Sequence, residues 1–215
     1  MVETGKYTGR SPDDKFIVDT PAVHDEIAWG KINVPIEESK FSAIKAKMLA
    51  YLQNRDLFVF DGFAGADPKY RQRFRIVNEL ASQNLFIHEL LIRPTKEELE
   101  DYEPDYTVIA APGFKCIPGV DGVHSEAAII INYETHEVLI AGSGYSGEIK
   151  KSVFSVMNYV LPKKGLLSMP CSANMRSCSY SFSGIEIRKI FLFCLSMPLT
   201  PYILTCFRLK VNTLF

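Results

Sequence analysis

Two basic positions of this 215-residue sequence stand in settings suited to binding an anion, and the first is Lys151. It follows the stretch GSGYSGEIK, residues 142–150, in which three glycines surround a tyrosine. Glycine lets a backbone approach a ligand closely, and a helix that begins after such a loop presents N–H groups at its positive end. Lys150 and Lys151 follow this loop, and Lys151 lies just over one turn into the helix, from where its side chain could reach back to the same anion. Spacing alone favours the alternative, in which both lysines coat a solvated helix face.

The second basic position is Arg10, which lies in the segment TGRSP. A turn between Gly9 and Pro12 would hold its guanidinium on a constrained backbone. The planar guanidinium binds a carboxylate or phosphate through two parallel hydrogen bonds. A solvated arginine in a surface turn is the alternative. The glycines before Lys151 do not form G-x-x-x-x-G-K-[ST], and this motif occurs nowhere in the sequence, so no P-loop is predicted.

Composition narrows the class of protein. Apolar residues make up 47% and charged residues 23%, as in an ordinary globular protein. The net charge of −1 gives no reason to expect nucleic acid or an anionic membrane as a partner. The five cysteines form no C-x-x-C pair, the four histidines have no metal-binding spacing, and the N-terminal residues have no apolar core. We therefore expect free thiols in a reducing compartment, which is the cytoplasm, and no secretory signal.

The elements that must position these residues follow from hydrophobic periodicity. Alternating or continuous apolar runs predict strands, and a recurrence at three and four residues predicts helices. Strands are expected over 15–20, 56–67, 73–79 and 105–112, a hairpin over 127–143, and helices over 35–54, 80–92, 95–102 and 146–161. Thr95 and Glu98 form a capping box, and Pro162 and Gly165 should close the last helix. This mixture predicts an α/β fold with a mixed sheet and packed helices.

The composition changes abruptly near Met175. Residues 1–174 hold 24 acids and 19 Lys or Arg, whereas residues 175–215 hold one acid and five Lys or Arg. The run 190–207 is mostly apolar, but it is short for a membrane span and contains Pro198 and Pro201. We therefore expect a poorly ordered tail and no membrane partner. A tail-anchored or aggregating product remains the alternative.

Several motifs in order resemble the N-terminal part of ATP-dependent phosphoenolpyruvate carboxykinase. They lie within residues 4–174 and read TGRSPDDKFIV, FRIVNELASQNLFIHELLIRP, HSEAAIIIN, GSGYSGEIKKSVFSVMNYVLP and SMPCSAN. The family converts oxaloacetate and ATP to phosphoenolpyruvate, CO2 and ADP in gluconeogenesis, with Mn2+ at the site and Mg2+ on the nucleotide. The resemblance implies a partial substrate domain over 1–165, the first strand of a nucleotide domain over 166–174, and an unrelated tail over 175–215.

The resemblance also implies roles for individual residues. Arg10 stands at the position of the family's arginine that binds the substrate carboxylate, and Tyr145 stands at that of a tyrosine that contacts the substrate. Lys151 corresponds to the lysine that helps hold the metal and the phosphoryl oxygens, so it is the candidate catalytic, ATP-side and metal-site residue. A fixed cation beside the enolate oxygen would lower the barrier to decarboxylation.

Two departures from the family pattern change the expectation for this chain. Pro170 occupies the position of the family's metal-ligand histidine in SMPCSAN and has no side-chain donor atom. The P-loop segment expected after Asn174 does not follow, so the nucleotide domain is expected to be absent. We therefore expect negligible turnover from this chain and doubtful binding of ATP and Mn2+ or Mg2+. The alternative function is a non-catalytic module that binds a dicarboxylate or another small anion, such as oxaloacetate or phosphoenolpyruvate.

Overall fold

The structure is a computed structural model that describes residues 6–7, 9–169, 172–176, 179–183 and 205–206. Its centre is a seven-stranded sheet with the strand order β2-β1-β6-β7-β5-β4-β3. The strands are β1 (Lys15–Asp19), β2 (Val34–Glu37), β3 (Phe58–Ala64), β4 (Gln72–Asn78), β5 (Tyr106–Ala111), β6 (Ala128–Asn132) and β7 (Glu137–Ala141). Neighbouring strands are parallel except in the pairs β3–β4 and β6–β7. The predicted α/β fold with a mixed sheet is confirmed.

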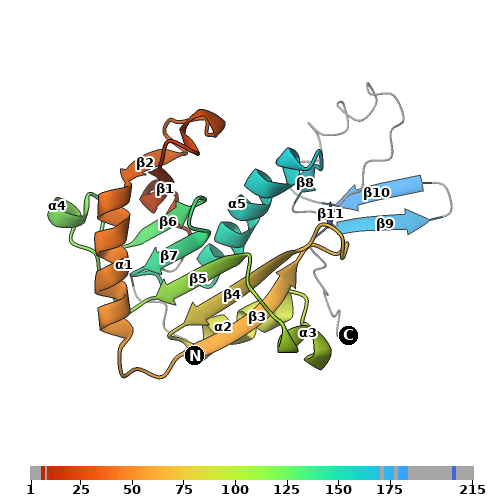
Figure 1. Cartoon of the computed structure of the whole chain (residues 1–215), viewed down its shortest axis with the longest axis horizontal. Helices are drawn as coiled ribbons and strands as arrows, with labels where there is room; N and C mark the ends of the chain where they lie inside the picture. The colour runs from red at the N-terminus through yellow and green to blue at the C-terminus, as the bar shows by residue number, and fades with distance from the viewer. Residues whose placement is uncertain (1–5, 8, 170–171, 177–178, 184–204, 207–215) are drawn as a thin grey trace.

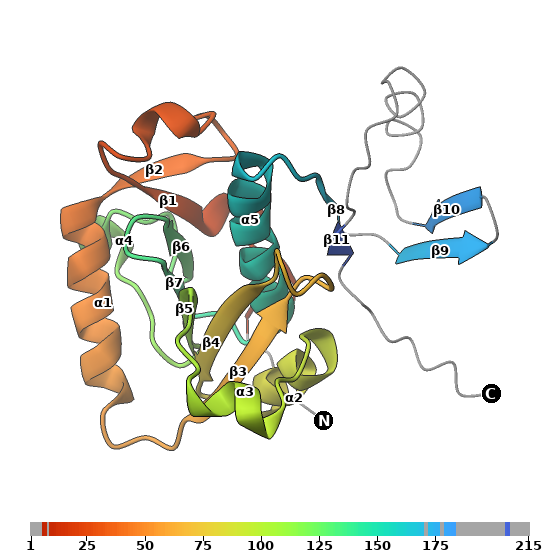
Figure 2. The same ribbon diagram turned by 45° about the vertical axis from the view of Figure 1, so that its right-hand side comes forward.

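Helices cover both faces of this sheet, as Figures 1 and 2 show. The helices are α1 (Glu38–Leu52), α2 (Ala81–Leu90), α3 (Lys96–Glu100), α4 (Pro118–Asp121) and α5 (Gly147–Lys163), with short 3-10 turns η1 (Pro12–Asp14) and η2 (His24–Glu26). Helix α1 packs on one face, while α2 and α5 pack on the other. The described sheet is therefore the middle layer of three.

The central strands are mostly apolar because both of their faces are buried. In β1, Phe16 packs with the α1 side of the core and Ile17 with the α5 side. Strand β6 repeats the pattern, since Ile130 faces α1 whereas Ile129 and Ile131 face α5. This alternation decides which strand residues can reach α5, and it places the candidate site described below.

Most predicted elements are present, but some differ from the prediction in their bounds or in their type. Residues 34–37 form β2, so α1 begins at Glu38 and not at Pro35. Strand β2 lies at the edge of the sheet and pairs only with β1, where a proline can be tolerated. Helix α5 continues through Pro162 to Lys163, and the short helix α4 lies in a segment predicted as a loop.

The C-terminal part of the chain is described only in short pieces. Strands β8 (Ser168–Met169) and β11 (Thr205–Cys206) pair in parallel, and β9 (Ser172–Arg176) and β10 (Ser179–Ser183) form an antiparallel pair. Nearly all of the predicted apolar run 190–207 lies outside the described residues. No helix within the described ranges is long and apolar enough to cross a membrane.

Candidate functional site

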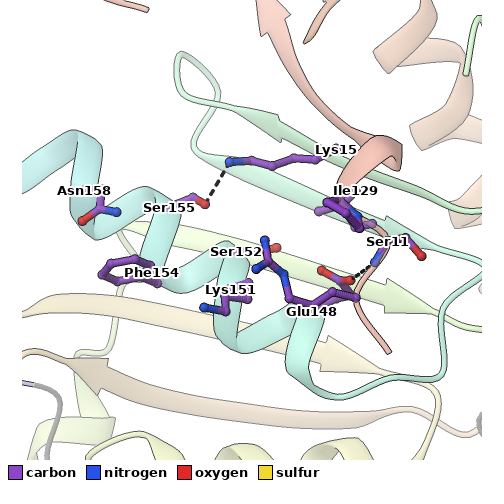
Figure 3. Close-up of a pocket in the computed structure, with 11 residues that line it drawn as sticks. Ser11, Lys15, Ile129, Glu148, Lys151, Ser152, Phe154, Ser155 and Asn158 are labelled. Carbon is purple, nitrogen blue, oxygen red and sulfur yellow. Dashed lines mark hydrogen bonds between the residues drawn. The ribbon is translucent and has the colours of Figure 1, made fainter. Parts of the chain in front are cut away.

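A cavity of about 280 Å³ lies between the start of β1 and one face of α5. Its wall is formed by three segments: the turn before β1 with its first strand residue, one position of β6, and a row of α5 residues (Figure 3). The lining residues are Arg10, Ser11, Pro12, Lys15, Ile129, Glu148, Lys151, Ser152, Phe154, Ser155 and Asn158. Two of the three predicted site residues, Arg10 and Lys151, therefore line one cavity.

Strand and helix periodicity explain why polar residues meet here. Lys15 shares a face of β1 with Ile17, which packs toward α5, because side chains two residues apart point to the same side of a strand. It also pairs in register with Ile129 of β6. On α5, residues three and four positions apart form one face, so Glu148, Lys151 and Ser155 project in the same direction.

The opposite face of α5 fixes the helix in the core. Ile149, Val153, Val156 and Met157 are almost fully buried against the sheet. Burying side chains of this size contributes about 1.5–3 kcal/mol each. The polar face of α5 is consequently held in position by the same helix turns that bury its apolar face.

Glu148 connects the arginine turn to the first turn of α5. Its carboxylate is buried and accepts a hydrogen bond of 2.7 Å from the Ser11 backbone N–H. The turn η1 then follows, with the Asp14 N–H donating to the Ser11 carbonyl at 3.1 Å. Arg10 itself is exposed and lies directly beside the residue that Glu148 holds. The side chain of Arg10 thus extends from a backbone that is bonded to α5.

Lys15 is the second cation from the β1 side. Its ammonium donates a hydrogen bond of 3.1 Å to the Ser155 hydroxyl, and Figure 3 shows the side chain reaching across to α5. Burial lowers the pKa of Lys15, the nearby positive charge of Arg10 lowers it further, and Glu148 acts in the opposite direction. Three cationic side chains, Arg10, Lys15 and Lys151, share the lining of this cavity.

One buried polar atom in the cavity wall, the Ser152 hydroxyl oxygen, has no hydrogen-bond partner among the described residues. A buried polar group without a partner costs about 1–3 kcal/mol. Ser152 lines the cavity, so a polar ligand bound there would remove that cost by supplying the missing hydrogen bond.

Tyr145, the third predicted site residue, is not part of the lining of this cavity. Its ring packs on Gly147 at the start of α5 so closely that a side chain on Gly147 would collide with it. Gly142, in the same loop, adopts a positive φ of 70°, and a Cβ there would lie 2.6 Å from the Glu126 carbonyl oxygen. The glycines therefore allow close packing of the loop and of the tyrosine ring.

The remaining predicted positions are placed as follows. Lys150, the neighbour of Lys151, does not line the cavity. Pro170 lies outside the described residues. Lys15 and Glu148 were not predicted as site residues, although both are within the quoted motif segments. Strand alternation from Ile17 and helical spacing from Lys151 were the signals that could have identified them.

The described lining does not fit a divalent cation by itself. It contains one carboxylate, and that carboxylate already accepts the Ser11 N–H. Three cationic side chains share the lining with it and would repel a metal ion. Across the described part of the chain, no group of three His, Cys, Asp or Glu residues is placed to bind a metal. We therefore derive no chemical step through a metal from these residues.

Comparison with known proteins gives the family. A sequence model described as phosphoenolpyruvate carboxykinase matches residues 1–188, which extends beyond residue 174, where the motifs end. Phosphoenolpyruvate carboxykinase (ATP) 1 of Moorella thermoacetica is 62% identical over 174 residues, or 81% of this chain and 33% of the relative. The Fusobacterium nucleatum phosphoenolpyruvate carboxykinase (ATP) is 61% identical over 175 residues, again 81% of this chain and 33% of the relative.

The chain spans about a third of the length of these curated relatives. The match nevertheless covers most of the residues of this chain, including the segments that form the cavity. The resemblance inferred from the motifs is confirmed, and this chain belongs to the ATP-dependent phosphoenolpyruvate carboxykinase family.

Proposed function

We propose that the cavity binds oxaloacetate through its carboxylates and that this chain supplies the substrate side of the carboxykinase reaction. The observation that supports this function most directly is the meeting of Arg10 and Lys151 in one cavity. They come from two motifs far apart in the sequence, and both side chains ordinarily carry a positive charge at neutral pH. A small dicarboxylate is the class of ligand that such a pair suits.

In this proposal each residue has a separate role. Arg10 binds a substrate carboxylate through its planar guanidinium. Lys151 lies beside the carbonyl oxygen of the substrate, on the side from which a phosphoryl group would arrive. Tyr145 contacts the substrate from the loop before α5, and since its ring packs on Gly147 its position is tied to the helix start.

The chemistry that these residues would support has two steps. The bond between the leaving carboxylate carbon and its neighbour breaks, CO2 departs, and the electron pair forms an enolate. Cations fixed beside the developing oxygen charge lower the barrier to that step, because they need no reorganisation as the charge appears. The enolate oxygen then attacks the γ-phosphorus of ATP, the bond to the β-phosphate oxygen breaks, and ADP leaves.

The proposal extends to the organisation and setting of the chain. We assign residues 1–165 to the substrate domain, 166–174 to the beginning of the nucleotide domain, and 175–215 to a tail of different origin. The family reaction belongs to gluconeogenesis in the cytoplasm, with Mn2+ and nucleotide-bound Mg2+. Because the sequence contains no P-loop motif and has Pro170 at the metal-ligand position, we expect a polypeptide of these 215 residues to turn over negligibly by itself.

Isothermal titration with freshly prepared oxaloacetate tests the binding part of the proposal. Removing the charged donor of Lys151 should cost about 1.5–3 kcal/mol, so Lys151→Ala should weaken binding at least about tenfold. Lys164→Ala is the matched control, because Lys164 is exposed at the end of α5 and does not line the cavity. Equal affinities for the wild type and Lys151→Ala would contradict the assignment.

The alternative is a module that binds an anion without catalysis, and the same cavity supports it. An assay of phosphoenolpyruvate formation from oxaloacetate, ATP and Mn2+ separates the two functions. Binding without product formation would favour the module for this polypeptide. Product formation well above that of Lys151→Ala would contradict the expected inactivity and favour the enzyme.

A further inference from the structure

Lys15 has no role in the function proposed above, although its ammonium lies in the cavity wall beside Ser155. The lining carries three cationic side chains, Arg10, Lys15 and Lys151, against one carboxylate, Glu148. By formal charge, three minus one leaves two positive charges in excess. Like charges enclosed together repel one another more strongly than in water. A cavity wall with this balance is complementary to a ligand with two negative charges.

The neighbours of Lys15 neutralise its charge only in part, since Glu148 acts on it without forming an ion pair. The ion pairs within the described residues do not include Lys15, and its hydrogen-bond partner is the neutral Ser155 hydroxyl at 3.1 Å. A lysine ammonium has three N–H donors, and a serine hydroxyl can accept from one of them. Lys15 therefore keeps donors for a ligand while Ser155 holds the amine at the α5 face.

Placement along α5 separates this amine from the arginine turn. Ser11 is bonded to Glu148 in the first turn of α5, whereas Lys15 is bonded to Ser155. The two helix positions are seven residues apart, which corresponds to about 10 Å along the helix axis. Figure 3 shows this separation, with Lys15 meeting Ser155 at one end and Ser11 meeting Glu148 at the other.

We propose that Lys15 is a second substrate anchor, which binds the carboxylate that Arg10 leaves free and makes the cavity select four-carbon dicarboxylates over monocarboxylates. This inference rests on the proposed function. In an extended four-carbon dicarboxylate, three carbon–carbon bonds place the carboxylate carbons about 4 Å apart. Adding a hydrogen bond of about 2.8 Å at each end gives a span of about 10 Å between the two cationic groups that such a ligand would join.

The position of Ser152 is consistent with a ligand that extends from Arg10 to Lys15. Ser152 lies between the two anchored helix positions, and its buried hydroxyl lacks a partner among the described residues. A ligand stretched from Arg10 to Lys15 would pass this residue and could supply the missing hydrogen bond. Asn158 lies one turn beyond Ser155 and closes the row of polar residues.

Titration with succinate and butyrate tests the inference, because the two acids share a four-carbon chain and differ by one carboxylate. Wild type should bind succinate more tightly than butyrate. Lys15→Met should weaken succinate at least tenfold and change butyrate less than about threefold, whereas Lys15→Arg should retain most of the preference. Lys164→Met is the control for the loss of one positive charge away from the cavity, and it should behave as wild type.

The outcomes distinguish this inference from the proposed function. If wild type binds neither oxaloacetate nor succinate, both fail. If wild type binds oxaloacetate and Lys15→Met keeps the preference for succinate, only the role of Lys15 is overturned. That role is also overturned if Lys15→Met weakens succinate and butyrate equally, because such a pattern indicates a collapsed cavity. Lys15→Gln carries the test if Lys15→Met lacks a cooperative thermal transition.

Discussion

Glu148 should contribute to anion binding in two ways that its variants can separate. Removing only its charge should lower stability without weakening binding, whereas removing its hydrogen bond as well should lower both. The carboxylate is buried and accepts the Ser11 N–H at 2.7 Å, so it holds the turn that carries Arg10. It is also the single acid in a lining with three cations. Glu148→Gln removes the charge and keeps an acceptor oxygen, whereas Glu148→Ala removes both.

The magnitudes follow from the contact. A hydrogen bond to a charged group contributes about 1.5–3 kcal/mol and a neutral one about 0.5–1.5 kcal/mol, so Glu148→Gln should cost about 1 kcal/mol of the free energy of unfolding. In a domain of this size, that corresponds to about 2–4 °C in melting temperature. Glu148→Ala should cost about 2–3 kcal/mol, because the Ser11 N–H also loses its partner.

Binding should separate the two variants. In Glu148→Gln the excess positive charge rises from two to three while the arginine turn stays bonded, so a dianion such as succinate should bind at least as tightly as to wild type. In Glu148→Ala the turn is released, and binding should weaken. Thermal unfolding followed by circular dichroism and titration with succinate measure both quantities. If the two variants weaken binding equally, the positioning role of the Glu148 hydrogen bond is refuted.

Three further predictions concern the surrounding fold. Burial, followed by the charge of Asp121, raises the pKa of Cys116 to about 12, so iodoacetamide at pH 8 should leave Cys116 unmodified in the folded protein and label it in urea, as peptide mass spectrometry would show. Burial tends to raise the pKa of Asp121, but hydrogen bonds from the Ile117 N–H and Lys47 outweigh it and leave the pKa lowered. The stabilisation by Asp121 is therefore present above the pKa that its carboxyl has in the unfolded chain, and it is lost as the pH falls through the pKa in the folded protein. Asp121→Asn should accordingly cost about 1–3 kcal/mol of the free energy of unfolding in urea at pH 7, and much less at pH 2. Gly142→Ala should cost more than about 1 kcal/mol in the same assay, because of the positive φ and the carbonyl oxygen 2.6 Å from the new Cβ; an unchanged urea midpoint would contradict this.

Local sequence signals predicted most of the fold because the elements carry their own periodicity. The apolar run of β6 and β7 predicted a hairpin, and the spacing of Ile149, Val153 and Val156 predicted the buried face of α5. The capping box at Thr95 was predicted and is present. Each of these features depends on residues close together in the chain, and the structure confirms them.

Features that depend on distant partners were not predicted. Strand β2 has four residues and contains Pro35, and it is a strand because β1 offers it an edge to pair with. Lys15 reaches a hydroxyl 140 residues away, and the Ser11 N–H reaches a carboxylate 137 residues away. Periodicity can place Lys15 and Glu148 on the faces that meet, but no local pattern specifies which distant residue each of them contacts. The meeting of Arg10 and Lys151 was expected from the family resemblance, and periodicity alone left it undecided.

Helix α5 presents one face to the core and another to the cavity, which has a consequence for how the protein opens. The amide protons in the middle turns of α5 exchange mainly when the buried face leaves the sheet, so we expect their protection to be close to that of global unfolding. The turn before β1 is attached to α5 through the Ser11–Glu148 contact, and it should exchange through small local openings. We therefore expect one wall of the cavity to exchange slowly and the other faster, so a ligand that bridges them should slow exchange mainly in the turn.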